Sequence, residues 1–174
     1  MGLGKSTKRC RECTRSLQNA LNRAEADVLH MMEREMDERP NLVYIGSCVL
    51  VALFHGDNLY VLNVGDSRAV LATYGEVLRA VELRDSHTVD YEAERIQILN
   101  EHPEDSLVII GRKVKGKLKV TRAFGVGYLK RKLISPPYVS LQPSLRWHKL
   151  SNSDRFLVLA SDGFCSTSSA MRKS

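Results

Sequence analysis

Four short apolar runs between Gly46 and Leu83 constrain the fold of this chain more than any other feature. They are GSCVLVALF (46–54), LYVLNV (59–64), RAVLAT (68–73) and EVLRAVEL (76–83). Glycine-containing turns separate them, so the chain reverses direction after each run. The first run is apolar on both faces, which is typical of a central strand. We therefore predict an antiparallel meander of up to four strands.

Helical periodicity precedes this meander. Apolar residues repeat at helical spacing from Ser16 to about Glu38, and Pro40 ends the pattern. The repeating positions are Leu17, Leu21, Ala24, Val28, Met32 and Met36. We predict one amphipathic helix whose methionines fill the core.

Three further elements follow the meander. A helix is predicted over about 89–100, with an apolar face of Ala93, Ile96 and Leu99. Alternation of Val114, Leu118 and Val120 predicts a strand pair around Gly116, and 156–160 reads as a buried strand. Helix, meander, helix and strands in this order indicate an α+β fold with a largely antiparallel sheet.

Length and charge limit the function classes. The chain has 174 residues, 43% of them hydrophobic, and a net charge of +6, which fits one globular domain. Residues 112–132 hold nine Lys or Arg, whereas residues 82–105 hold eight acids. The basic stripe is either a solvated strand face or a surface that attracts an anionic partner such as a phosphoprotein. We expect no nucleic-acid binding, because only two aromatics lie in the stripe.

The N-terminus combines a lipidation pattern with cysteines. Met1 to Ser6 fits the N-myristoylation pattern at Gly2, and a basic cluster follows. Cys10 and Cys13 are candidates for palmitoylation, and together with the basic cluster they would stabilise peripheral membrane contact. A chance match at Gly2 is the alternative. A zinc site at Cys10 and Cys13 is disfavoured, since no second Cys/His pair has suitable spacing.

The compartment follows from what the sequence does not contain. No apolar run is long enough for a membrane span, and the basic start has no apolar signal region. The four cysteines lack a disulfide-framework spacing. We expect an intracellular protein, in the cytoplasm, in the nucleus or at the inner face of the plasma membrane, with reduced thiols and no obligate oligomer.

Asp162 is the first candidate for chemistry. It follows the apolar run 156–160 and precedes Gly163. A carboxylate at the end of a buried strand suits a hard cation such as Mg²⁺ or Mn²⁺. Other motifs give weaker indications of function. GLGKST (2–7) lacks the earlier glycine and the preceding strand of a phosphate-binding loop, and the five histidines have no metal or catalytic spacing.

Seven runs together resemble the metal-dependent type 2C protein phosphatases, closest to a plant subgroup. They occur in the family's order and cover about residues 16–164. The runs are GSCVLV (46–51), NVGDSRAVLA (63–72), HTVDYEAERI (87–96), NEHPED (100–105), VKGKLKVTRAFGVGYLK (114–130), SPPYVS (135–140) and SDRFLVLASDG (153–163).

The resemblance implies an antiparallel β-sandwich flanked by helices, and hydrolysis of phosphoserine and phosphothreonine in proteins. It also implies two Mg²⁺ or Mn²⁺ ions held by carboxylates and waters, with a metal-activated water as nucleophile. Asp162 matches the metal-binding Asp of the family's S-D-G motif. Asp66 matches an acidic residue implicated in an additional metal site.

Departures from the family pattern imply an incomplete domain. Residues 1–15 are a basic segment without the family's first Asp-Gly motif, 16–164 are a partial phosphatase domain, and 165–174 are a polar tail without the downstream Asp-Asn motif. We therefore expect Asp66 and Asp162 as metal residues, no assignable catalytic residue, and an inactive chain. The alternative is a catalytically dead, phosphatase-like interaction protein, in contact with partners or a membrane. We also expect disorder over 1–14 and 165–174.

Overall fold

The computed structural model describes residues 3–83, 85–130 and 136–163. Two α-helices and two short 3-10 helices lie in these ranges: α1 (Leu3–Arg34), η1 (Pro40–Tyr44), α2 (Glu92–Glu101) and η2 (Gly127–Leu129). Within them, no helix combines the length and the hydrophobicity that crossing a bilayer requires.

The described strands form two three-stranded and two two-stranded sheets, all of them antiparallel. The strands are β1 (Gly46–Ser47), β2 (Val49–His55), β3 (Asn58–Val64), β4 (Arg68–Tyr74), β5 (Leu78–Glu82), β6 (Ile109–Ile110), β7 (Lys113–Val114), β8 (Phe124–Gly125), β9 (Ser144–Lys149) and β10 (Asp154–Ala160). The larger sheets have the orders β2-β3-β9 and β10-β4-β5, and the small ones pair β1 with β8 and β6 with β7.

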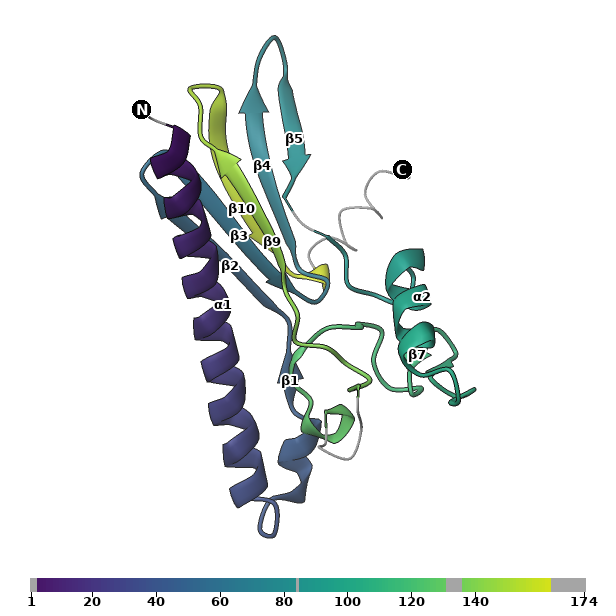
Figure 1. Ribbon diagram of the computed structural model, residues 1–174. Helices are drawn as coiled ribbons and strands as arrows, with labels where there is room; N and C mark the ends of the chain where they lie inside the picture. Colours follow the sequence, from purple (N-terminus) through teal and green to yellow (C-terminus); the bar gives the residue numbers. More distant parts are fainter. Residues whose placement is uncertain (1–2, 84, 131–135, 164–174) are drawn as a thin grey trace.

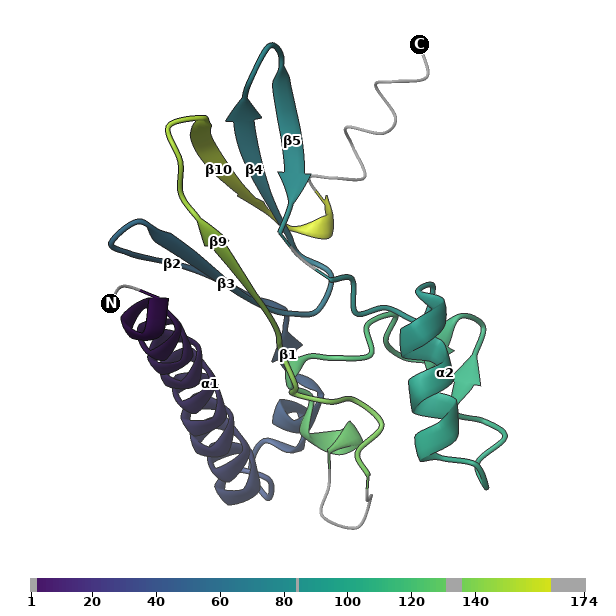
Figure 2. The ribbon, with the colours of Figure 1, turned by 45° about the horizontal axis from the view of Figure 1, so that its top comes forward.

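The two larger sheets pack face to face as a sandwich. Leu59 and Val61 of β3 share one core cluster with Ala69 and Leu71 of β4, and Leu157 of β10 packs against them. α1 covers the other face of the β2-β3-β9 sheet, where its Leu21 contacts Leu62 and Val64. Figures 1 and 2 show α1 along one side of the sandwich and α2 on the far side of the irregular connections. The predicted α+β fold, an antiparallel sandwich flanked by helices, is confirmed.

The prediction of one continuous meander is wrong, because β3 and β4 belong to different sheets. The turn between them contains Gly65 at φ +115°, a conformation that side chains rarely adopt. A Cβ there would lie 2.3 Å from Cys48 Sγ, so only glycine allows this close crossing. The four predicted strands form two hairpins that face each other.

Two strands differ from prediction in their burial. The run 46–54, expected in the centre of the sheet, forms β1 and the edge strand β2, while β3 is central and almost fully buried. The strand at 156–160 forms, but Phe156 is 55% and Val158 is 38% exposed. These side chains lie on the outer face of the β10-β4-β5 sheet, which no described layer covers.

The first helix starts earlier than predicted and buries most of the predicted face, since Leu21 and Met32 are buried and Leu17, Val28 and Met36 are half-buried. α1 spans Leu3–Arg34, so residues 3–14 are helical rather than disordered, whereas 165–174 lie outside the described residues. Ala24, expected in the core, is exposed, and its neighbour Glu25 is 5% exposed. The carboxylate of Glu25 is buried because it has partners in the η2 region.

The second helix, by contrast, buries a different face than predicted. In α2, Ile96 and Leu99 are exposed, while Ile98 and Glu94 are buried. Ile98 belongs to a second core cluster with Val89, Val108 and neighbouring apolar residues. The apolar face that periodicity predicts for α2 is therefore rotated around the helix axis relative to the face that is buried.

The basic stripe is solvated, since Arg112, Lys113, Lys117 and Lys119 are exposed, but it does not form the predicted strand pair. Around Gly116 the structure has only the two-residue pairing of β6 with β7 and isolated bridges. Much of the stripe pairs with the acidic block: Arg112 and Lys119 reach Asp90 at 2.6 and 3.0 Å, and Lys115 reaches Asp105 at 2.9 Å. The two charged segments are therefore joined by ion pairs at Asp90 and Asp105.

Candidate metal centre

Asp66 lies in the turn that carries the chain from β3 to β4. Its side chain is half-buried, and the Cys48 thiol donates a hydrogen bond to Asp66 Oδ1 with a sulfur–oxygen distance of 3.2 Å. The close approach of Gly65 to Cys48 brings the two side chains together. The carboxylate is therefore oriented by a residue 18 positions earlier in the chain.

Hydrogen bonds from Asn63 and His87 hold the same turn in place. The Asn63 side-chain amide donates to the carbonyls of Gly65 at 3.3 Å and Asp85 at 3.1 Å. The backbone N–H of His87 donates to the Gly65 carbonyl as well, at 3.3 Å. Because Asn63 is fully buried, this anchor belongs to the sandwich core and holds the Asp66 turn in place.

Asp162 follows the end of β10 at the sandwich edge. Its side chain is exposed, and the Gly163 N–H donates to Asp162 Oδ1 at 2.8 Å. The predicted position at a strand end is confirmed by β10 ending at Ala160.

The Cys48 thiol lies within electrostatic reach of both carboxylates. Burial raises the pKa of Cys48 to about 11; a backbone hydrogen bond at Asp66 opposes this shift, and the negative charges of Asp66 and Asp162 add to it. The strand register gives the same placement: Ala160 at the end of β10 pairs with Arg68 at the start of β4, so Asp162 and Asp66 lie at the same edge of this sheet.

These residues fit a cation only as part of a larger ligand set. Hard divalent cations prefer six or more oxygen ligands, in part from water. Within residues 3–83, 85–130 and 136–163, no group of three or more His, Cys, Asp or Glu side chains is close enough to hold a metal ion. The described residues by themselves do not form a complete Mg²⁺ or Mn²⁺ site.

The residues predicted for lipidation fall in two places. Gly2 lies outside the described residues. Cys10 and Cys13 are half-buried free thiols on α1. Their palmitoylation is not tested by this arrangement and stays a prediction.

A buried polar network lies beside α2. His87 Nδ1 and Nε2 lie 3.1 Å from Glu94 Oε1 and from Ser144 Oγ, respectively. Thr121 donates to Glu94 Oε2 at 2.5 Å, and Arg122 donates to both carboxylate oxygens at 2.6 and 3.1 Å. Burial disfavours the charged carboxylate, but these hydrogen bonds outweigh it and lower the pKa of Glu94 to about 2. The network links α2 to the sandwich.

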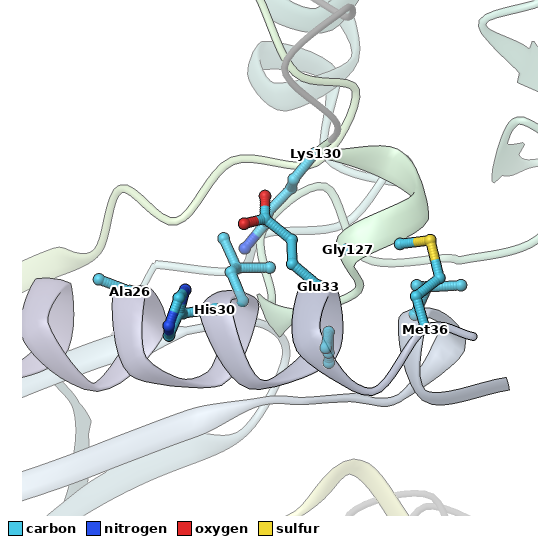
Figure 3. A pocket seen from close by; sticks show the side chains of 9 residues that line it. Ala26, His30, Glu33, Met36, Gly127 and Lys130 are labelled. Carbon is cyan, nitrogen blue, oxygen red and sulfur yellow. The ribbon is translucent and has the colours of Figure 1, made fainter. Parts of the chain in front are cut away.

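A cavity of about 500 Å³ lies near the C-terminal end of α1, separate from Asp66 and Asp162. Figure 3 shows Ala26, His30, Glu33 and Met36 from the α1 side and Gly127 and Lys130 from the opposite side. Lys130 Nζ pairs with Glu25 Oε1 at 2.5 Å, and the Gly125 N–H donates to Glu25 Oε2 at 2.7 Å. Burial lowers the pKa of Lys130, and Glu25 opposes that shift.

Sequence patterns missed the residues that build this environment. Cys48 and Asn63 sit inside apolar strand runs, where local sequence gives no sign of a polar role. Glu25 and Glu94 sit on amphipathic helices, where a carboxylate reads as solvated. For the two glutamates, the one available signal was a basic residue far along the chain that could pair with each of them, such as Arg122 for Glu94.

Comparison with known proteins assigns the family. The sequence model described as Protein phosphatase 2C matches residues 3–170. The chain is 56% identical over 163 residues to "Probable protein phosphatase 2C 40" of Arabidopsis thaliana, covering 84% of this chain and 33% of that protein. It is 48% identical over 165 residues to "Probable protein phosphatase 2C 39" of Oryza sativa subsp. japonica, covering 84% and 32%. The chain thus spans about a third of the length of these relatives.

Solved structures support the fold. The crystal structure of a serine-threonine phosphatase 2C from Toxoplasma gondii matches with a TM-score of 0.63 at 23% identity, covering 84% of this chain and 49% of that one. A Caenorhabditis elegans sex determining protein matches with a TM-score of 0.60 at 23% identity, covering 79% and 31%. With a family match over nearly its whole length, this chain belongs to the protein phosphatase 2C family.

Proposed function

We propose that this chain is part of a metal-dependent protein serine/threonine phosphatase, in which Asp66 and Asp162 contribute to a Mg²⁺ or Mn²⁺ centre. The observation that supports the proposal best is that β10 ends opposite the start of β4, where Ala160 pairs with Arg68, so Asp162 and Asp66 follow and precede this pair at one sheet edge in a chain of this family. The substrate class is a protein that carries phosphoserine or phosphothreonine.

We further propose that the 174 residues alone do not turn over a phosphoprotein. Asp66 and Asp162 are only two carboxylates, and neither is part of a larger cluster in the described ranges. Positioning a metal-bound water takes a full set of ligands. The remaining ligands would have to come from elsewhere.

Turnover of a phosphopeptide with excess Mn²⁺ tests both statements. We expect no activity from the chain alone, and Mn²⁺ that binds weakly to the wild type and still more weakly to Asp162→Asn. Asp57→Asn is the matched control, because Asp57 is exposed in the β2–β3 turn at the opposite end of β3 from Asp66. Robust turnover that Asp162→Asn abolishes and Asp57→Asn keeps would overturn the inactivity.

A phosphatase-like interaction protein is the second candidate, and the same limited ligand set favours it. A folded chain that binds a phosphopeptide without hydrolysing it would support this candidate. Membrane contact through an acylated Gly2 is a separate proposal. Replacing Gly2 with Ala is expected to move a fluorescent fusion from membranes to the cytosol, and an unchanged distribution would refute the anchor.

A further inference from the structure

A hairpin in the basic stripe has a backbone that is held in rare conformations. β6 pairs with β7, and Arg112 and Lys115 beside them have φ angles of +60° and +50°. Side chains other than glycine rarely adopt this left-handed region, and residues that do so cluster at active sites and ligand clamps. We call residues 111–119 the basic hairpin. Its conformation is one that glycine would adopt freely, yet two of these positions carry a cation.

Hydrogen bonds and a buried anchor keep the basic hairpin in place. Val114 is fully buried and belongs to the same core cluster as Val108. The Lys115 N–H donates to the Val108 carbonyl and the Val114 N–H to the Leu118 carbonyl, both at 2.7 Å. The Lys115 ammonium reaches Asp105 Oδ2 at 2.9 Å. The exposed side chains are therefore presented from a fixed backbone, which reduces the entropy that a partner loses on binding.

The cations of the basic hairpin fall into two sets. Arg112 and Lys119 pair with Asp90 at 2.6 and 3.0 Å, so part of their charge is balanced within the molecule. Lys113 and Lys117 are exposed, and neither makes an ion pair with a residue that the structure describes. The turn brings them together, since the backbone N–H of Gly116 donates to the Lys113 carbonyl at 3.2 Å. Two ammonium groups without acids of their own thus lie on one turn.

Apolar side chains and a groove adjoin these lysines. Leu107 is 60% and Ile110 is 45% exposed. A Cβ at Gly116 would lie 3.7 Å from Ile110 Cβ, so the turn that carries the lysines lies against this side chain. Between the basic hairpin and the start of α2 lies a groove of about 480 Å³, where the exposed Arg95 adds a further cation. The groove is lined by Val89, Asp90, Glu92, Arg95, Ile109 and Arg112.

We propose that the basic hairpin and this groove form a docking surface for an acidic segment of a partner protein. Carboxylates of the segment pair with Lys113 and Lys117, and its apolar side chains contact Ile110. Charge complementarity selects this occupant, because the two lysines have no acid partner among the described residues. A groove takes a narrow peptide segment, whereas the flat surface of an anionic membrane would leave it unfilled. Docking needs neither a metal ion nor phosphate hydrolysis.

The test measures the fluorescence anisotropy of a labelled glutamate-rich peptide with interspersed leucines, titrated with the full chain. We expect binding that weakens as the ionic strength rises from about 0.05 M to about 0.5 M, because salt screens exposed charges. Lys113→Glu combined with Lys117→Glu is expected to weaken binding about tenfold, through two lost ion pairs and new repulsion. Both lysines are exposed, so the unfolding midpoint in urea is expected to stay unchanged.

A matched pair of substitutions separates the docking surface from net charge. Arg23→Glu combined with Lys149→Glu makes the same charge change at exposed positions of α1 and β9, and is expected to leave the affinity within about twofold. Equal losses in the two double variants, or no binding of the peptide to the wild type, would overturn the proposal. Binding of the wild type to vesicles of phosphatidylcholine and phosphatidylserine that the hairpin variant loses, with no binding of the peptide, would identify a lipid surface instead.

Discussion

Glu25 on α1 and Glu94 on α2 are both buried carboxylates, but their surroundings differ. Glu94 accepts hydrogen bonds from Thr121 and Arg122 and lies against His87, so three side chains share its charge. Glu25 depends on the Lys130 ammonium and one backbone N–H from Gly125. The first carboxylate is held by a network and the second by a single cation.

The difference teaches how robust each contact is. A buried ion pair becomes strongly destabilising when one partner is removed, because the remaining charge stays out of water. A network loses less, since the remaining donors still satisfy part of the carboxylate. The α1–η2 contact is therefore expected to be the more fragile of the two.

Lys130→Met is expected to have the largest effect. It leaves Glu25 buried with only the Gly125 N–H, which costs roughly 3–5 kcal/mol of unfolding free energy. Urea denaturation followed by circular dichroism measures the loss. Lys117→Met, at an exposed position of the same stripe, is the control. A loss no greater than that of the control would mean that Glu25 is not buried against Lys130 in solution.

Acid is expected to break the Glu94 network. The pKa of Glu94 is about 2, below its usual 4.5, so the folded protein binds this proton more weakly than the unfolded chain does. The resulting stability is fully present above pH 4.5 and is lost as the pH falls towards 2. The shift corresponds to about 3 kcal/mol.

Stability measured between pH 6 and pH 2 in wild type and Glu94→Gln checks this expectation. The side-chain amide of the Glu94→Gln variant does not titrate in this pH range, so the stability of this variant is expected to change less with pH. Glu92→Gln, exposed in the first turn of the same helix, serves as the matched substitution. If wild type and Glu94→Gln lose stability in parallel, other carboxylates govern the acid transition.

Arg122→Met is expected to have the smallest effect of the three. Glu94 keeps Thr121 and His87, so the cost is about 1–3 kcal/mol, as for a partly satisfied buried acceptor. Arg23→Met, exposed on α1, controls for loss of an arginine. The comparison with Lys130→Met is decisive: an Arg122 variant less stable than the Lys130 variant would reverse the proposed order of the two contacts.

Much of the fold could be predicted because it depends on local pattern. The apolar runs and glycine turns predicted the strands at 59–64 and 68–73 closely, and β3 and β4 occupy those positions with one added residue at most at each end. The positions of Asp66 and Asp162 at element ends were also visible in sequence. The resemblance of seven separate runs to one family then predicted the β-sandwich, because all seven agree with the same fold.

The sequence by itself determined the four strands between Gly46 and Glu82, the strand before Asp162 and the middle of both helices, because spacing and turn residues act over a few positions. It did not determine the first turns of α1 or the strand β9. Only the tertiary structure decided that β3 and β4 lie in opposite sheets, since that depends on Gly65 passing Cys48. It also decided which face of α2 is buried, since Ile98 and Glu94 are inside and the predicted Ile96 and Leu99 are exposed. Glu25 and Glu94 are inside because Lys130 and Arg122, about a hundred and about thirty residues away, compensate their charges, and a local pattern contains no information about partners at that distance.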